Sequence, residues 1–238
     1  MRLTVIASGS SGNCSLLEIG SVRLLLDCGI SCKRIRTAIL PLGLTPDDLD
    51  GILITHEHTD HTTGLRTMLN HHPMPVYTRP KTMTAISRIC PNIGDAFSPL
   101  FDKVTIGDVT VEAFPTSHDA ADPIGFSVSC GEKFSLATDL GIVTNSVLSS
   151  IADADVLLLE ANHDRQLLQK GSYPQTLKRR ILSPRGHLDN RTAGDTLCRL
   201  VKRPDHVVLG HMSEENNRPL LARQTVEAVI SEAGMIPT

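Results

Sequence analysis

Aromatic side chains are scarce in this sequence. They make up 3% of the 238 residues, and tryptophan is absent. Proteins that bind single-stranded nucleic acid by base stacking need exposed aromatic rings along the binding groove. The composition therefore leaves little for a stacking platform, and any contact with nucleic acid is expected to be sequence-nonspecific contact with the backbone.

Long apolar runs and a basic leader are also missing. No window approaches the roughly 18 apolar residues that a membrane-spanning helix needs. The sequence begins MRLTVIASGSSGN, with one basic residue and too short an apolar stretch for a signal peptide. We therefore expect a cytoplasmic protein without a membrane partner.

Paired cysteines and a large excess of one charge are absent too. The six cysteines form no Cys-x-x-Cys pair, so reduced and mostly buried thiols are expected rather than a disulfide framework. The formal net charge of −3 argues against binding nucleic acid by bulk charge alone. Local basic clusters are still present, so nucleic acid remains a candidate partner.

Apolar runs rich in Val, Ile and Leu alternate with amphipathic stretches throughout the chain. Strands are expected at Leu3–Ala7, Ser15–Ile19, Val22–Asp27, Gly51–Thr55, Val109–Phe114, Gly125–Cys130, Lys133–Thr138, Val156–Glu160 and His206–Gly210. Helices are expected at Lys33–Leu40, Thr62–Asn70, Arg79–Ile89, Asn145–Ile151, Pro174–Leu182, Asn190–Leu200 and Leu220–Ala233. The mixture predicts an α/β (α+β) protein of two face-to-face sheets with helices outside, in a single domain over residues 1–238.

The most informative segment, ILITHEHTDH, runs from Ile52 to His61. His56 and His58 are two residues apart, so in extended backbone their side chains point to the same side. Asp60 and His61 follow where the chain turns into the helix expected near Thr62, and they can face a second point. Imidazole and carboxylate together suit Zn, Mn or Fe, so this one segment can ligate two metals.

Further ligands must come from elsewhere, because this segment cannot complete two coordination spheres. Asp139 and His211 each follow directly after an expected strand, and His118 lies just past one. A single His or Asp in such a place is usually a capping or loop residue. Three of them at the same kind of position, in a chain that already has the first cluster, favour metal ligands.

The order HxHxDH, a distant His, an Asp before Gly and a terminal His resembles the metal pattern of the metallo-β-lactamase superfamily over residues 51 to 213. The resemblance implies a four-layer αββα sandwich of two mixed sheets and a site for two divalent metal ions (Zn, Mn or Fe). It implies that one metal is bound by His56, His58 and His118. It implies that the second is bound by Asp60, His61 and His211, with Asp139 bridging both.

The position of Asp139 is typically Cys in the true β-lactamases. Asp here therefore indicates the phosphodiesterase, nuclease and thioesterase branches of the superfamily. Two nearby cations lower the pKa of a bridging water and neutralise charge on a phosphoryl or carbonyl oxygen. Asp60 can ligate and orient the resulting hydroxide as a catalytic residue. Glu57 is the poorer candidate, because its side chain should point away from those of its histidine neighbours.

Four outer segments narrow the resemblance to the YycJ (WalJ, VicX) family, small metallo-β-lactamase-fold proteins associated with DNA exonuclease activity. They are Ala7–Ser15, Glu160–Asp164, Ser183–Asn190 and Leu209–Asn217. The resemblance covers nearly the whole chain and implies a metal-dependent, 5′-directed exonuclease with DNA as substrate. The chain departs from the usual family pattern at Asp189 and Ala161, two positions where Ser is common. The added anion at Asp189 is expected to alter how phosphate is received nearby.

The segment that contains Ser10, Ser11 and Asn13 has two interpretations. Its glycines and small hydroxyls let backbone N–H groups approach an anion, which makes it a candidate substrate-binding loop. It can equally be a tight turn between two strands, and both interpretations stay open. It is not a nucleotide-binding fingerprint, since the GxGxxG spacing is absent.

His187 follows Arg185 and Gly186, a pairing that suits a phosphate-facing loop. We hypothesise that His187 is catalytic, assisting the leaving oxygen or holding the scissile phosphate; the alternative is a loop residue before the next helix. Asn162 and His163 lie at a strand end on the same expected rim. They are candidates for binding substrate or for hydrogen-bonding metal ligands.

Two basic runs, Lys33–Arg36 and Lys178–Arg180, are solvated helix faces by default. The second lies shortly before Arg185 and His187, where it can guide a polyanion toward the site. The leading interpretation is thus a phosphodiesterase, with nucleic acid as the expected partner. Metal ligands alone do not separate it from a small-molecule phosphodiesterase or a thioester or lactone hydrolase of the glyoxalase II type. A non-enzymatic metal-binding protein is disfavoured, because structural zinc needs closed coordination.

Overall fold

In the computed structural model, the described residues (1–91 and 93–235) form two six-stranded sheets. The first has the strand order β1 (Arg2–Ala7), β2 (Cys14–Ile19), β3 (Val22–Leu26), β4 (Gly51–Leu53), β5 (Val76–Thr78) and β6 (Phe97–Pro99). The second has the order β12 (His206–Gly210), β11 (Val156–Glu160), β10 (Glu132–Ala137), β9 (Ile124–Cys130), β8 (Val109–Pro115) and β7 (Lys103–Ile106).

Both sheets are mixed. In the first, β1 to β3 pair antiparallel and β3 to β6 pair parallel. In the second, β7 and β8 pair antiparallel, whereas β10, β11 and β12 pair parallel. The predicted fold class, α/β with two mixed sheets, is therefore confirmed.

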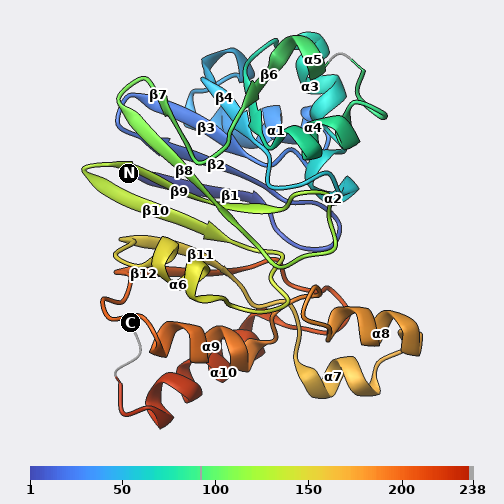
Figure 1. Ribbon diagram of the computed structural model, residues 1–238, viewed down its shortest axis with the longest axis vertical. Coiled ribbons are helices and arrows are strands. Elements are labelled where there is room, and N and C mark those ends of the chain that lie inside the picture. The colour runs from blue at the N-terminus through green and yellow to red at the C-terminus, as the bar shows by residue number, and fades with distance from the viewer. Residues whose placement is uncertain (92, 236–238) are drawn as a thin grey trace. The chain divides into compact units, whose positions relative to one another are not determined.

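Along the chain the helices begin after β3 and lie between the later strands, and α10 follows the last strand (Figure 1). They are α1 (Cys32–Ile39), α2 (Thr59–Thr62), α3 (Leu65–His71), α4 (Pro80–Ile86), α5 (Ile93–Ala96), α6 (Asn145–Ile151), α7 (Arg165–Lys170), α8 (Gln175–Ile181), α9 (Asn190–Cys198) and α10 (Pro219–Glu232). In the described part of the chain, none of these is long and apolar enough to cross a bilayer. All six cysteines are free thiols and four of them are buried, as predicted.

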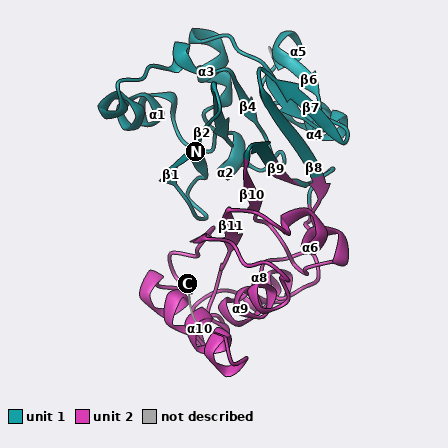
Figure 2. Cartoon of the chain, turned by 90° about the vertical axis from the view of Figure 1, so that its left-hand side faces the viewer, with its two compact units in different colours: residues 1–113, 120–124, 128–131 teal, residues 114–119, 125–127, 132–238 magenta. Residues whose placement is uncertain are grey.

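The chain divides into two units (Figure 2). Unit 1 contains residues 1–113, 120–124 and 128–131, and unit 2 contains residues 114–119, 125–127 and 132–238. Each unit has its own apolar core and its own cluster of histidines and carboxylates. The single domain over residues 1–238 stays a prediction.

The core of unit 1 lies between its sheet and its helices. Strands β2 and β3 carry the continuous apolar runs Leu16–Leu17 and Leu24–Leu26, which are buried on both faces of the sheet. Ile35 of α1 and Met68 of α3 pack into the same cluster. This packing fixes the carboxyl ends of β3 and β4, from which the histidine-rich segment departs.

The core of unit 2 is built on the parallel strands β10, β11 and β12. Helices α6, α9 and α10 contribute apolar side chains to one cluster with these strands. Gly194 lets α9 approach α10 closely, because a Cβ there would lie 2.8 Å from Cβ of Val229. Since the three strands are parallel, the residues that follow them, among them Asp139 and His211, leave the sheet at one edge.

The predicted elements appear with shifts of one or two residues at most ends, but one helix differs. The helix expected at Thr62–Asn70 is split into α2 and α3, and α2 begins at Thr59. The break lies at Gly64, whose N–H donates to Cys28 O and where a Cβ would lie 1.9 Å from Ile30 O. The prediction missed β5, β6, β7, α5 and α7, because elements of three to six residues are too short to show a periodic pattern.

Candidate metal centre

The ligand candidates of unit 1 gather at the carboxyl end of β4. Nε2 of His56 lies 3.0 Å from Nδ1 of His58, and the ring centroids are 4.5 Å apart. The two rings thus lie on the same side, as their spacing predicts. Asp60 and His61 belong to the first turn of α2, with 3.4 Å between Asp60 Oδ2 and His61 Nε2.

These distances fit a divalent metal ion. Metal–ligand bonds of about 2.0–2.1 Å in tetrahedral geometry place donor atoms about 3.3 Å apart. The separations of 3.0 and 3.4 Å within this cluster are close to that value. Imidazole nitrogens and a carboxylate are also the donors that Zn, Mn and Fe accept.

Asp27 and Thr55 hold two of these histidines from behind. Asp27 is buried, and its Oδ2 lies 2.8 Å from Nδ1 of His61. The Thr55 hydroxyl donates to Asp27 and lies 3.0 Å from Nδ1 of His56. Because both Nδ1 atoms face oxygen acceptors, it is the Nε2 atoms that face the other ligand candidates, His58 and Asp60. Sequence reasoning missed Asp27, although it follows an expected strand as the ligand candidates do.

Asn13 contacts the cluster through a tight turn. Its Oδ1 accepts a hydrogen bond from the N–H of Gly9, and its Nδ2 lies 3.3 Å from Asp60 Oδ2 and 3.1 Å from His61 Nε2. The turn closes through the Gly12 N–H to Gly9 O, and Gly12 has φ +148°. The segment is thus a turn that brings Asn13 onto the ligands, with Ser10 and Ser11 exposed at its tip.

Glu57 turns away from its histidine neighbours, as the sequence predicts. Its Oε1 accepts a hydrogen bond of 2.8 Å from the backbone N–H of Ala121. The neighbouring Ile124 N–H donates to Thr55 O. Glu57 therefore fastens the 120–124 segment to the end of β4, which leaves it no role in ligating metal.

Unit 2 carries a second cluster at the carboxyl ends of its parallel strands. Asp139 Oδ1 lies 3.4 Å from Nε2 of His211 and 3.6 Å from Nε2 of His118. Nδ1 of His118 lies 3.2 Å from the carbonyl oxygen of Gly186, so Nε2 is the ring nitrogen that faces Asp139. Burial lowers the pKa of His118, so its ring is neutral and available as a ligand at neutral pH. These separations again fit donors around one divalent cation.

Glu160, the last residue of β11, joins two histidines of this cluster. Its Oε1 lies 2.7 Å from Nδ1 of His187 and 3.0 Å from Nδ1 of His211. Its Oε2 accepts the backbone N–H groups of Leu140 and Leu188. Burial alone would raise the pKa of this fully buried carboxyl, but the charge and hydrogen bonds of the two histidines outweigh it and lower the pKa. Sequence reasoning gave Glu160 no role, although it too lies at a strand end.

His187 lies among the ligand candidates of unit 2. Its ring centroid is 4.9 Å from that of His118 and 5.2 Å from that of His211. With Asp139 and Glu160, His187 and His211 offer donor atoms within 4.8 Å of one another. About a fifth of the His187 side chain is exposed, whereas the Glu160 side chain beneath it is not. His187 is thus the member of this group that solvent reaches best.

The loop that carries His187 is closely packed. Its backbone N–H donates to Ile181 O at the end of α8, and the Gly186 N–H donates to Ser183 O. A Cβ at Gly186 would lie 2.1 Å from Ile181 O, so only glycine fits there. The guanidinium of Arg185 donates to the carbonyl oxygen of His118. The loop is thereby held against the His118 segment.

Three residues of the two clusters have left-handed backbone. Asp27, Asp139 and His211 have φ of +56°, +57° and +53°. Among the residues that the structure describes, Asp153 is the one other non-glycine residue with positive φ. Such conformations cost about 1–3 kcal/mol each and concentrate at functional sites. The strand ends are thus shaped to aim these side chains.

Asn162 and His163 follow Glu160 but differ in their surroundings. Asn162 Nδ2 donates to the carbonyl oxygen of His211 at 2.8 Å, so it holds the backbone of a ligand candidate. His163 is 1% exposed, and neither ring nitrogen has a hydrogen-bond partner. In this conformation His163 cannot touch a substrate. Burial lowers its pKa to about 4, against the opposing effect of Asp189.

Replacing His163 with leucine is expected to reduce the acid sensitivity of the metal-free protein. Its pKa of about 4 lies below the ordinary 6.5, so the unfolded chain binds the proton more tightly and stability falls as the pH drops through this range. At pH 5 the residue should account for a loss of about 2 kcal/mol in the free energy of unfolding. Urea unfolding in EDTA at pH 7.5 and pH 5 measures it, with exposed His71→Leu as the control. Equal acid sensitivity of His163→Leu and the wild type would refute the assignment.

Asp189 is the N-cap of α9. Its carboxylate accepts the backbone N–H groups of Arg191 and Thr192 and the Thr192 hydroxyl. It also pairs with Arg165 of α7, with 2.8 Å between Oδ2 and Nε. The anion that departs from the family pattern is therefore engaged in capping α9 and in attaching α7.

Asp189→Ala is expected to lower the free energy of unfolding by about 1–2 kcal/mol, since both the cap and the ion pair with Arg165 are lost. Asp189→Ser is the matched control, because a serine hydroxyl still caps the helix. Urea denaturation at pH 7.5 compares the two variants. Equal destabilisation by Ala and Ser would show that capping is not the main role of this carboxylate.

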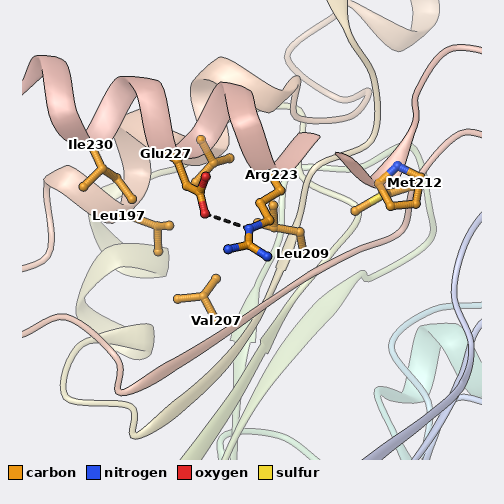
Figure 3. A pocket seen from close by; sticks show the side chains of 9 residues that line it. Leu197, Val207, Leu209, Met212, Arg223, Glu227 and Ile230 are labelled. Carbon is orange, nitrogen blue, oxygen red and sulfur yellow. Dashed lines mark hydrogen bonds and ion pairs between the residues drawn. The ribbon is translucent and has the colours of Figure 1, made fainter. Parts of the chain in front are cut away.

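A separate pocket of unit 2 lies between α9, α10 and β12 (Figure 3). Its volume is about 300 Å³, and most of the residues that line it are apolar, with Leu197, Leu209 and Ile230 among them. Its charged residues, Arg223 and Glu227, pair with each other at 2.7 Å. This lining offers neither His nor Asp, so the pocket is not the predicted metal centre.

The chain is similar to known proteins in both sequence and fold. Residues 22–212 match the family described as Beta-lactamase superfamily domain. The chain is 37% identical to the exodeoxyribonuclease WalJ of Streptococcus pneumoniae serotype 2 (strain D39 / NCTC 7466), over 98% of this chain and 90% of the relative. It is 36% identical to the exodeoxyribonuclease YycJ of Bacillus anthracis, with the same coverage. Its fold is similar to that of Zn²⁺-bound PqqB from Methylobacterium extorquens, with TM-score 0.73 and 18% identity over 99% of this chain and 97% of that one.

Proposed function

This chain belongs to the β-lactamase superfamily and, within it, to the WalJ/YycJ family, and from that premise we propose that it is an exodeoxyribonuclease. It has the metallo-β-lactamase fold of a metal-dependent hydrolase. The observation that carries the proposal is the 37% identity to an exodeoxyribonuclease along 98% of the chain. Direction from the 5′ end is part of the proposal and rests on the family resemblance. The cytoplasm is its proposed location.

We propose two divalent metal ions, Zn, Mn or Fe, as cofactors. The order of the motifs assigns the first to His56, His58 and His118. It assigns the second to Asp60, His61 and His211, with Asp139 shared. The donor separations within each unit, from 3.0 to 3.6 Å, support this assignment. When bound, such a pair makes hydroxide available near neutral pH and neutralises phosphoryl charge.

The side chains around the proposed cations position the attacking water and donate a proton to the leaving group. Asp60 holds the attacking water in line through its carboxylate. His187 delivers a proton to the leaving oxygen from Nε2, because its Nδ1–H is engaged by Glu160. The buried carboxylate of Glu160 stabilises the protonated imidazole before the transfer. His187 is thus the proposed general acid, oriented by a charged group beneath it.

Substrate contact is proposed for the exposed residues of the outer motifs. Ser10 and Ser11 lie at the tip of the first turn, and Arg185 lies beside His187. Asn13 and Asn162 act indirectly, by positioning ligand candidates. Asn13 contacts Asp60 and His61, and Asn162 donates to the carbonyl oxygen of His211.

The test uses metal-stripped protein loaded separately with Mn²⁺ and Zn²⁺. Substrates are 5′-phosphorylated single- and double-stranded DNA, RNA of the same sequence, bis(p-nitrophenyl) phosphate and a glutathione thioester. Release of mononucleotides from DNA is expected, with turnover falling steeply as salt rises. Thioester turnover without any phosphodiester turnover would overturn the proposal in favour of the glyoxalase II type. Turnover of the aryl diester alone would favour a small-molecule phosphodiesterase.

A further inference from the structure

One stretch of this acidic protein has only basic residues among its charged side chains. Residues 165–185, which we call the basic arm, contain six basic residues and no acidic one. The formal net charge of the whole chain is −3. The arm consists of α7, α8 and the turns that join them to the rest of unit 2, and Figure 1 shows it apart from α9 and α10. Its positive charge is therefore concentrated on one projection of the fold.

The arm begins and ends beside the proposed general acid. Asn162 N–H donates to Leu188 O, and Asn190 N–H donates to His163 O, so the segments that lead into and out of the arm are bonded to each other. The His187 N–H donates to Ile181 O in the last turn of α8. His187 therefore lies next to the last turn of α8, whose basic residues are Lys178, Arg179 and Arg180.

Four of the six cations are used inside the protein. Lys178 is buried, and its Nζ donates to Gln169 O and Gly171 O, which braces α8 against the end of α7. Arg165 pairs with Asp189, and Arg180 pairs with Asp119 at 2.6 Å. Arg185 donates to the carbonyl oxygen of His118. These contacts hold the arm in place at both ends and along its length.

The other two cations, Lys170 and Arg179, do not take part in such contacts within the described structure. Both are exposed, and neither makes a side-chain hydrogen bond or ion pair with any residue that the structure describes. Each lies in the last turn of its helix. A helix of seven residues such as α8 is about 10 Å long. Phosphates along one DNA strand are spaced about 3.4 Å apart, so the helix is as long as about three of them. Lys and Arg are the side chains that neutralise backbone phosphates.

We infer that the basic arm grips the phosphodiester backbone of the DNA strand being degraded, with Lys170 and Arg179 as its phosphate contacts. The inference rests on the proposed function for the choice of DNA. The four cations that make contacts within the protein hold the arm in position, and Lys170 and Arg179 contact the DNA phosphates. Contact with the backbone also suits a chain with so few aromatic residues for base stacking.

The test compares Lys170→Gln/Arg179→Gln with Arg191→Gln/Arg223→Gln. Both double variants remove two exposed positive charges, but the control pair lies on α9 and α10. Binding of fluorescein-labelled single-stranded DNA is measured by anisotropy in EDTA, across a range of salt, so that turnover is not required. Hydrolysis of DNA and of bis(p-nitrophenyl) phosphate is measured in parallel.

The arm variant should bind DNA on the order of tenfold more weakly at 0.1 M salt, and its log–log salt slope should be shallower by about 1.4, since each lost contact removes about 0.7. Its ratio of DNA to aryl-diester kcat/KM should fall similarly. The control should match the wild type within about twofold. Equal DNA affinity and slope in the arm variant and the control would overturn the inference. A wild type that binds DNA through the arm but hydrolyses no phosphodiester would refute the proposed function alone.

Discussion

Replacing His58 with alanine is expected to abolish hydrolysis of DNA and of an aryl phosphodiester together. Nδ1 of His58 lies 3.0 Å from Nε2 of His56, so both nitrogens are donors to one proposed ion. Its loss leaves that ion with an incomplete ligand set. Metal ions contribute several kcal/mol to such a reaction, so the loss in kcat/KM should be on the order of a thousandfold.

The control for His58→Ala is His71→Ala. His71 is an exposed histidine at the end of α3 in the same unit, outside the ligand cluster. Bound metal per chain is measured by mass spectrometry of the dialysed protein, beside both activities. The control should keep its metal and its turnover. Activity close to the wild-type level in His58→Ala would contradict the ligand assignment.

Replacing Glu160 with glutamine is expected to lower activity by about 10- to 100-fold, the usual cost of losing a carboxylate behind a metal-bound histidine. The buried carboxylate touches His187 and His211 through one oxygen and accepts two backbone N–H groups through the other. The oxygen of the glutamine amide can accept either from the two histidines or from the two backbone N–H groups, but the NH₂ group then faces the remaining N–H donors. The variant thus loses a charge and gains an unsatisfied contact.

Two measurements separate the roles of Glu160. Metal affinity reports its support of His211, and kcat at saturating metal reports its support of His187. Both should fall in Glu160→Gln, and neither should change in Glu112→Gln, an exposed glutamate of β8. Unchanged metal affinity and unchanged kcat in Glu160→Gln would show that the carboxylate serves packing alone.

The sequence allows the fold class and the main ligand candidates to be predicted because these signals are local. His56 to His61 lie within six consecutive residues, and each later candidate follows a strand with an obvious apolar run. Short elements such as β5 and α5 escaped prediction, because three or four residues cannot show periodicity.

Asp27 and Glu160 escaped prediction for another reason, since their roles depend on pairing between strands. In the parallel pair of β3 and β4, Leu26 lies opposite Leu53, which brings Asp27 beside Thr55. The parallel register of β11 and β12 likewise places Glu160 opposite Gly210 and next to His211. Neither register can be deduced from either strand alone.

Asp189 shows how the structure changes the interpretation of a motif. From the sequence, its charge was expected to affect phosphate in the neighbourhood of His187. In the structure its oxygens are occupied by the first turn of α9 and by Arg165. The carboxylate is therefore engaged within the protein, where it caps α9 and pairs with the first residue of the basic arm.

The most direct test of the metal-dependent mechanism is a titration of metal-stripped protein with Mn²⁺, followed by DNA hydrolysis and bound metal in the same samples. Turnover should be absent in EDTA and should rise until about two ions are bound per chain, as a paired-cation mechanism requires. DNA hydrolysis that persists in EDTA, or that is complete when one ion is bound, would contradict the paired site.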